Sequence, residues 1–296
     1  LLQLGDQSRA ETERWLVDAD HARLGFARAG KLVVLPTAAS LRKAQAQMAL
    51  QAAVGPSQEA LSEADALRIE PALRTFAGRI AGAIYTPSEC VIDSHALCQY
   101  LESQLRGRGV EFRLGTTVRD FVRHGGRVTR LVTDGGDLPV DSVVLACGPA
   151  SAAMARRLGF SLPIQPLKGY SITLPVRDAA TAPVVSVTDA ARKVVYARIG
   201  DRLRVAGMAE IGAPGLEVDS ARIEELIAHT RQAFGDAVDY RDVEPWAGLR
   251  PATPTSVPII GASPCPNVFL NVGHGALGLT LAFGSARRLV EQLDIA

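Results

Sequence analysis

The stretch at residues 267–293, NVFLNVGHGALGLTLAFGSARRLVEQL, decides the fold of this chain. Its first six residues alternate and are mostly apolar, which is typical of a buried strand. Three glycines follow with the spacing G-x-G-x-x-G, namely Gly273, Gly275 and Gly278. Residues 277–293 continue with helical spacing and no proline. The sequence therefore predicts a strand, a tight glycine turn and a helix.

This turn would aim unpaired backbone N–H groups and the positive end of a helix dipole at one point. A phosphate, a carboxylate or a reduced flavin would fit there. The glycine pattern alone is weak evidence for a dinucleotide site, because such a site opens a βαβ unit with an acidic residue about 20 positions further on. Glu291 and Asp294 stand near that offset, but within or at the end of the predicted helix. A plain packing of helix on strand stays an alternative.

The bulk composition bounds the class of protein. With 296 residues, of which 47% are hydrophobic and 21% charged, the chain can form one large or two ordinary domains with ample core. The net charge of +1 gives no electrostatic reason to expect nucleic acid or an anionic membrane as the main partner. No apolar run approaches the ~20 residues of a membrane span, and no signal peptide is visible. The cytoplasm, or a peripheral position on the inner face of the cytoplasmic membrane, is the expected location.

The cysteines and the first residue carry two further expectations. Cys90, Cys98, Cys147 and Cys265 lack metal-binding spacing, so we expect no metal and buried thiols in a reducing compartment. The sequence starts at Leu1 rather than methionine, and its first residues read as the middle of a helix. We therefore expect a fragment, or a chain whose upstream part has been removed.

Hydrophobic periodicity predicts a parallel, doubly covered layer interleaved with an antiparallel one. The apolar run at 139–147 predicts a strand buried on both faces. Expected helix caps are Thr37 or Ser40, Ser62, Asp93 and Ser220. The expected helices lie at residues 1–23, 37–54, 62–70, 94–108 and 220–234. The other expected strands lie at 25–36, 110–114, 118–123, 128–133, 162–174, 184–187, 193–199 and 202–206, with hairpin turns at 125–126 and 200–201. Residues 83–91 are expected to be a strand or a loop.

Several strings resemble, in order, the FAD-dependent D-amino-acid dehydrogenases of the wider D-amino-acid oxidase and glycine oxidase group. The resemblance runs from about Leu61 to Leu293, and the last string is its most specific part. These strings are PLKGYSI (166–172), VAGMAEI (205–211), WAGLRPATP (246–254), PIIG (258–261) and NVFLNVGHGALGLTLAFGSARRL (267–289).

The resemblance implies an α/β fold with a glutathione-reductase-type FAD-binding domain and a discontinuous, mostly antiparallel substrate domain. Residues 1–60 and 161–243 would form the substrate-binding domain, and residues 61–160 and 244–296 the FAD-binding domain. The resemblance also implies a strand and a G-x-G-x-x-G turn that hold the FAD pyrophosphate and would precede Leu1. Without that first βαβ unit, we expect the chain alone to bind FAD poorly or not at all.

The activity implied by the resemblance is the oxidative deamination of D-amino acids in amino-acid catabolism. Hydride passes from Cα to flavin N5, the imino acid hydrolyses to a keto acid and ammonia, and the electrons go on to a quinone or carrier. The family string T-P-D-G reads Thr253-Pro254-Thr255-Ser256 here, which removes a polar contact near the flavin. An oxidase of glycine or a secondary amine, and a non-catalytic subunit that depends on a partner, stay alternatives.

Arg250 is the foremost candidate for the catalytic site. An arginine in the apolar passage between Leu249 and Pro251 is costly to bury unless it meets an anion. Its fork matches an amino-acid carboxylate with two parallel hydrogen bonds, which would fix Cα for transfer. The resemblance implies this role, and an internal salt bridge is the alternative.

Further site residues are expected from the resemblance. His274 could be a general base, although a backbone-positioning or packing role is favoured. Tyr196 and Arg198 share one face of a strand and would line the pocket or form part of a surface ladder, and the same holds for Lys168 and Tyr170. The flavin would contact Gly248, Arg250, Gly273, His274, Gly275, Leu277, Gly278, Leu279 and Thr280 at its ring, and Val118, Ala146, Cys147 and Gly148 near its adenine and ribose.

Overall fold

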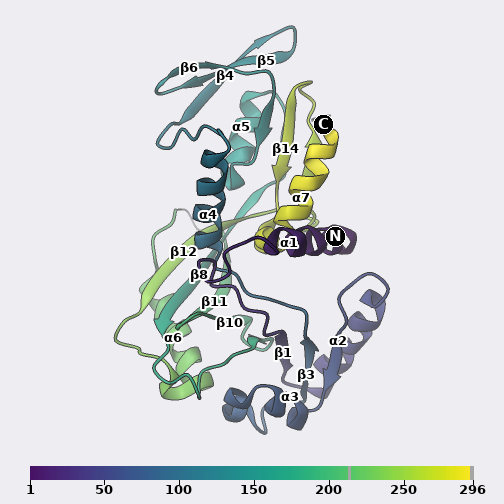
Figure 1. The fold of residues 1–296 in the computed structure, drawn as a ribbon, viewed down its shortest axis with the longest axis vertical. Coiled ribbons are helices and arrows are strands. Elements are labelled where there is room, and N and C mark those ends of the chain that lie inside the picture. Colours follow the sequence, from purple (N-terminus) through teal and green to yellow (C-terminus); the bar gives the residue numbers. More distant parts are fainter. Residues whose placement is uncertain (213–214, 294–296) are drawn as a thin grey trace.

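The computed structural model describes residues 1–212 and 215–293, which form three β-sheets and the helices around them (Figure 1). The large sheet has eight strands in the order β12-β8-β11-β10-β9-β1-β3-β2, and only β1 and β9 pair in parallel. These strands are β1 (Lys31–Leu35), β2 (Glu59–Leu61), β3 (Gly82–Thr86), β8 (Gln165–Pro175), β9 (Ser186–Asp189), β10 (Val194–Ile199), β11 (Arg202–Ile211) and β12 (Glu244–Ala252).

Helix α6 (Ser220–Phe234) packs on one face of the large sheet, against β8 and β11. The alternation of β8 directs Tyr170, Ile172 and Leu174 to this face, where they join the main core with Leu226 and Phe234. This face is therefore closed, and any ligand site on the large sheet has to use the opposite face of β8, β11 and β12.

Two three-stranded sheets form the other half of the molecule. The first has the order β13-β14-β7 and the second the order β4-β5-β6, and the two share a core around Val128, Leu145 and Leu270. Strand β14 pairs in parallel with β7 and antiparallel to β13. Their bounds are β4 (Val118–His124), β5 (Arg127–Thr133), β6 (Gly136–Pro139), β7 (Val143–Leu145), β13 (Ile259–Ala262) and β14 (Val268–Val272).

The last helix, α7 (Gly278–Gln292), follows β14 and packs across α1 (Leu2–Leu16), as Figure 1 shows. Gly284 permits this close approach, because a Cβ at that position would lie 2.8 Å from the backbone nitrogen of Ser8. The other helices are α2 (Ala38–Gln51), α3 (Glu63–Ile69), α4 (Ser94–Gly107) and α5 (Ser151–Arg157), with short 3-10 helices η1 (Pro71–Phe76), η2 (Gly148–Ala150), η3 (Gly235–Ala237) and η4 (Gly275–Leu277).

Most of the predicted caps and turns are confirmed. Thr37 and Ser40 form a reciprocal capping box at α2, while Ser62 caps α3 and Asp93 caps α4. Both predicted hairpin turns join antiparallel strands, β4 to β5 and β10 to β11. The prediction of Ser220 as a cap is wrong, because the Asp219 carboxylate accepts from the N–H of Ala221 and Ser220 is already the first helical residue.

Three strand predictions need correction. Residues 110–114 form no strand, because the N–H of Val110 bonds to the carbonyl of Leu105 and closes the end of α4 instead. Within 25–36 only β1 is a strand, and Ala27 makes an isolated bridge to Val91. Of the strand predicted at 139–147, only β7 forms, and it lies at the edge of its sheet. Val144 is 40% exposed there, so the prediction that this strand is buried on both faces is wrong.

The burial of the cysteines also differs from the expectation. Cys98 and Cys147 are exposed, Cys90 is partly buried and Cys265 alone is buried, since the others lie on α4, at the end of β7 and in a loop.

Strands β2, β3 and β12 belong to the large sheet, although the expected boundaries assigned most of them to the flavin-binding part. A division by sheets would move residues 82–86 and 244–252 to the substrate side, and the two-domain division itself stays a proposal.

Asn267 holds the start of β14 in place, and its replacement should be costly. The buried Asn267 amide accepts from the N–H of Val128 and donates to the carbonyls of Val128 and Asp141. Asn267→Leu leaves these buried backbone groups unpaired, so we expect a loss of about 3 kcal/mol in the free energy of unfolding, measured by urea titration. Asn267→Asp keeps only the acceptor and should also destabilise; wild-type stability in both variants would contradict this role.

Candidate functional site

The glycine turn after β14 adopts the predicted strand–turn–helix geometry. Gly273 has φ 82° and Gly275 has φ 56°, both in the left-handed region that favours glycine. A Cβ at Gly273 would lie 2.5 Å from Cγ2 of Thr253, so the close approach of the 253–258 loop also requires glycine there. We call residues 273–280 the glycine corner; it comprises the turn, η4 and the first residues of α7.

The helical end of the glycine corner is open and uncapped. Among the residues that the structure describes, no side chain caps α7, and its first turn holds no acidic residue. Leu277 and Leu279 are 37% and 42% exposed, and a Cβ at Gly278 would meet nothing within 4 Å. The first N–H groups of a helix have no partner within the helix and carry its positive dipole end. The corner therefore fits an electron-rich group such as the pyrimidine edge of a flavin.

Arg250 lies on β12, on the face of the large sheet opposite α6. Its guanidinium lies over Gly169, where any Cβ would overlap it, and its Nη1 donates to the carbonyl of Met208 at 2.8 Å. Desolvation by burial lowers the pKa of Arg250 from its ordinary value. Within residues 1–212 and 215–293 no carboxylate lies within 4 Å of it. The described residues thus do not form the internal salt bridge that was the alternative, and the partly buried, charged guanidinium is left for an anion.

The chain brings Arg250 and the glycine corner together. Ala252 forms an isolated antiparallel bridge with His274, and its Cα lies 3.9 Å from a Cβ built on Gly275. Arg250 stands two residues before Ala252 on the same strand, which places it on the same face about 7 Å away along the backbone. The backbone of Arg250 thus lies near the glycine corner, while its guanidinium extends over Gly169.

The His274 ring is turned onto α7. Its Nε2 lies 2.8 Å from Oγ of the fully buried Ser285, and desolvation by burial lowers the pKa of His274 from its ordinary value. The neutral ring is therefore favoured in the folded protein and is already engaged by the helix. This geometry supports a positioning role for His274, in which it ties the glycine corner to α7.

The lowered pKa of His274 predicts a pH-dependent contribution to stability. The folded state favours the neutral imidazole, so this contribution is complete above about pH 6.5, the ordinary pKa, and is lost as pH falls through the lower folded pKa. We expect His274→Asn to lose less stability than the wild type between about pH 7 and about pH 5. Urea titrations across this range measure the difference, and equal slopes would refute the assignment.

The tyrosine and arginine expected on β10 lie away from Arg250. Directly paired residues share a face, and the register places Tyr196 with Val205, Ile172 and the α6 side of the sheet. Tyr196 is fully buried there, with its ring centre 5.0 Å from that of Phe234. Arg198 shares this face, as expected, but donates to the carbonyls of Gly200 and Ala179.

Lys168 and Tyr170 also share the α6 face. Tyr170 donates its hydroxyl to Glu210 at 2.9 Å, and Lys168 is buried with its ammonium over the Tyr170 ring. The structure therefore separates Tyr196, Arg198, Lys168 and Tyr170 from the Arg250 face. Strand alternation predicted which residues share a face, but it could not indicate which face is closed by α6.

The residues expected near adenine and ribose divide into two groups. Ala146 and Cys147 are exposed at the end of β7, and Gly148 begins η2 with φ 56°, in contact with β12. The N–H of Cys147 donates to Oγ of Ser151. Val118 instead begins β4, opposite Thr133, in the separate β4-β5-β6 sheet. The first group thus lies beside the strand that carries Gly248 and Arg250, and Val118 belongs to a different sheet.

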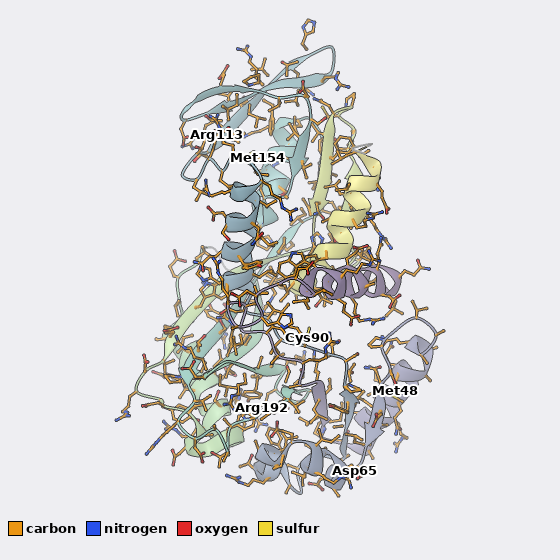
Figure 2. All side chains as sticks on the ribbon, in the orientation of Figure 1. Met48, Asp65, Cys90, Arg113, Met154 and Arg192 are labelled. Atoms are coloured by element: carbon orange, nitrogen blue, oxygen red, sulfur yellow. The ribbon has the colours of Figure 1, made fainter. Side chains whose placement is uncertain are left out.

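A cavity of about 320 Å³ adjoins the glycine corner. Leu277, Leu279 and Thr280 form one wall, α1 forms another, and Cys90, labelled in Figure 2, lies on a third. Arg250 does not line this cavity. The residues that sequence reasoning missed lie on the Arg250 face: Arg204 and Trp246. The spacing of Trp246, Gly248 and Arg250, two residues apart on one strand, was the signal that could have indicated Trp246.

No group of three or more His, Cys, Asp and Glu side chains is placed to hold a metal ion in residues 1–212 and 215–293. Among the helices of the same ranges, none is long and apolar enough to cross a membrane.

The chain is similar to several bacterial D-amino acid dehydrogenases. It is 45% identical to D-amino acid dehydrogenase 2 of Ralstonia nicotianae, over 98% of this chain and 71% of that protein. It is 43% identical to D-amino acid dehydrogenase 2 of Pseudomonas aeruginosa, over 99% and 69%. The match to the D-amino acid dehydrogenase of Paramagnetospirillum magneticum is 44% identical but covers 77% of this chain and 54% of that protein.

Solved structures share the fold. L-proline dehydrogenase from P. horikoshii superposes with a TM-score of 0.87 at 16% identity, over 98% of this chain and 78% of that one. Glycine oxidase from Geobacillus kaustophilus gives 0.86 at 23% identity, over 98% and 79%. The expected α/β fold with an antiparallel substrate-side sheet is thereby confirmed. Residues 1–292 match the family model described as FAD dependent oxidoreductase, DAO. The chain belongs to this family of FAD-dependent oxidoreductases.

Proposed function

We propose that this chain is a D-amino acid dehydrogenase, which oxidises a D-amino acid with FAD and releases a keto acid and ammonia. Relatives at 43–45% identity that bear this name support the substrate class. The observation that carries the proposal is the Arg250 guanidinium, which is partly buried, donates to the carbonyl of Met208 and has no carboxylate within 4 Å among the described residues, on a strand that bridges to the glycine corner. A ligand with a carboxylate next to its reacting carbon suits this arrangement.

The glycine corner and the adjoining cavity suit the flavin. FAD, when bound, accepts the hydride from the substrate Cα. The backbone N–H groups at the start of α7 would stabilise negative charge on the ring, because no side chain caps them and no acidic residue competes in the first turn. Ala146, Cys147 and Gly148 are proposed to lie near the adenosine part. In this proposal the large sheet is the substrate side and the small sheets with α7 are the flavin side.

Arg250 would orient the substrate. Its fork can form two parallel hydrogen bonds to the carboxylate, and its backbone lies in a nine-residue strand paired along its full length with β8. A rigid strand limits the positions that Cα can take in front of the corner. His274 is engaged by Ser285, so the substrate amine would lose its proton to solvent before transfer rather than to this ring.

A dye-reduction assay of the FAD-loaded protein tests the proposal. We expect D-amino acids to reduce an artificial acceptor under anaerobic conditions, and little peroxide to form in air if a quinone or carrier is the natural acceptor. Turnover of glycine, sarcosine or L-proline with peroxide release would identify an amine oxidase of the same group instead. An FAD-loaded protein that no amine reduces would favour a non-catalytic subunit that depends on a partner chain.

A further inference from the structure

The face of the large sheet that carries Arg250 also carries a second arginine, Arg204 of β11. Arg204 is paired directly with Thr173 of β8. Its Nη1 donates to Oγ1 of Thr173 at 3.3 Å and its Nη2 donates to Oγ of Ser171 at 3.0 Å. Both hydroxyls lie on the face opposite α6, so the Arg204 guanidinium lies on the same side of the sheet as that of Arg250.

The two guanidinium groups are close enough for one small molecule to reach both. Arg250 lies over Gly169, and Arg204 lies beside Ser171. Gly169 and Ser171 are successive residues of one strand face, which sets them about 7 Å apart. An amino acid with carboxylates at both ends of a short chain can reach two cations at this spacing.

The Trp246 indole lies on the same face, next to Arg204. Its ring covers Gly248, which pairs directly with Gly169, and the Cζ of Arg204 lies 5.6 Å from its ring centre. The two glycines leave room for the indole and the Arg250 guanidinium to lie flat on the sheet. Trp246 is 54% exposed, so it offers an open apolar surface on the face that carries both arginines.

Neither guanidinium is neutralised by the described part of the chain. In residues 1–212 and 215–293 no carboxylate lies within 4 Å of Arg204 or Arg250, whereas the neighbouring Arg202 has Glu244 at 2.6 Å. Of the three arginines on this face, Arg202 is thus paired, and the other two have hydroxyl and carbonyl partners among the described residues. A partly buried cation without an anion is costly, and an anionic ligand would relieve that cost at both positions.

We propose that Arg204 binds the side-chain carboxylate of an acidic D-amino acid, D-aspartate or D-glutamate, while Arg250 holds its α-carboxylate. The hydrocarbon part of the substrate lies along the Trp246 indole. This inference rests on the proposed function, because it names the substrate class of the same site. It makes Arg204 a specificity-determining residue rather than a support for the Ser171 and Thr173 hydroxyls alone.

Steady-state kinetics of the FAD-loaded protein test the inference through a ratio. We expect Arg204→Gln to lower kcat/KM for D-glutamate roughly 10- to 100-fold more than for D-alanine, because only the acidic substrate loses a charged hydrogen bond. Arg204→Glu should shift the preference from D-glutamate towards D-lysine. Arg241→Gln is the matched control, since Arg241 is exposed and paired with Asp239. An equal loss for both substrates would show a purely structural Arg204 and overturn the inference.

A binding measurement separates this inference from the proposed function. Calorimetric titration with glutarate requires no turnover, and we expect Arg204→Gln and Arg250→Gln each to weaken glutarate binding at least tenfold relative to the wild type. If no D-amino acid reduces the flavin but glutarate binding follows this pattern, the two-arginine site stands and the proposed function fails. Failure of the wild type to bind glutarate more tightly than butyrate would overturn the two-arginine site.

Discussion

Arg250→Met should lower kcat/KM for every D-amino acid substrate on the order of a hundred- to a thousandfold, because truncating one partner of a buried charge pair costs several kcal/mol. The loss should appear first in KM, since the carboxylate is bound in the ground state, and also in kcat if Cα is misplaced. Arg250→Lys keeps the charge but loses the planar guanidinium, so we expect its loss of kcat/KM to be smaller than that of Arg250→Met. Steady-state assays with a dye acceptor measure both constants.

The free energy of unfolding of Arg250→Met and the kcat/KM of a second variant, Gly169→Ala, serve as controls for this prediction. Arg250 makes one hydrogen bond, to Met208, and no ion pair with a described residue, so Arg250→Met should leave the free energy of unfolding within about 1 kcal/mol of the wild type. Gly169→Ala acts on the same group indirectly, because its methyl group would occupy the place of the Arg250 guanidinium. We expect it to lower kcat/KM at least tenfold. A loss of less than threefold in Arg250→Met would remove Arg250 from the site.

Tyr196→Ala should destabilise the protein by about 3–5 kcal/mol, while Tyr196→Phe should be neutral or slightly stabilising. The ring is fully buried against Phe234, so its removal leaves a large cavity in the main core. The hydroxyl is buried without a hydrogen-bond partner among the described residues, and burial raises the pKa of Tyr196 well above its ordinary value. The deletion of that hydroxyl therefore removes an unsatisfied polar group.

Urea titration of both Tyr196 variants, together with their turnover, decides between the core and a pocket. The core assignment predicts that Tyr196→Phe keeps the wild-type kcat/KM within about twofold, because the residue lies on the α6 face and Arg250 on the other. A tenfold loss of turnover in a variant of unchanged stability would place the Tyr196 hydroxyl in the active site.

Local sequence signals predicted the fold well wherever the cause was local. The glycine spacing at 273–278 and the caps at Thr37, Ser62 and Asp93 depend on residues three or four positions apart. The run at 110–114 has strand composition, but the N–H of Val110 donates to the carbonyl of Leu105 at the end of α4. Propensity alone does not reveal such a competition between a helix end and a strand.

The site could be predicted only in part, because faces and partners are properties of the assembled sheet. Arg250 and the glycine corner were found from their chemistry and from a family resemblance. The closed α6 face around Tyr196 depends on pairings such as β11 with β8, more than 25 residues apart in the sequence. The proximity of Arg204 to Arg250 likewise needs the register of three strands, which no single periodicity contains.

Anaerobic bleaching of the bound flavin tests the central claim most directly. The claim is that the glycine corner and Arg250 hold a flavin and a carboxylate side by side. The FAD-loaded wild type should lose its visible flavin band on addition of a D-amino acid, but not on addition of the corresponding amine that lacks the carboxylate. Arg250→Met should bind FAD equally well and bleach far more slowly. Equal bleaching by the amino acid and the amine, or unchanged bleaching in Arg250→Met, would contradict the account.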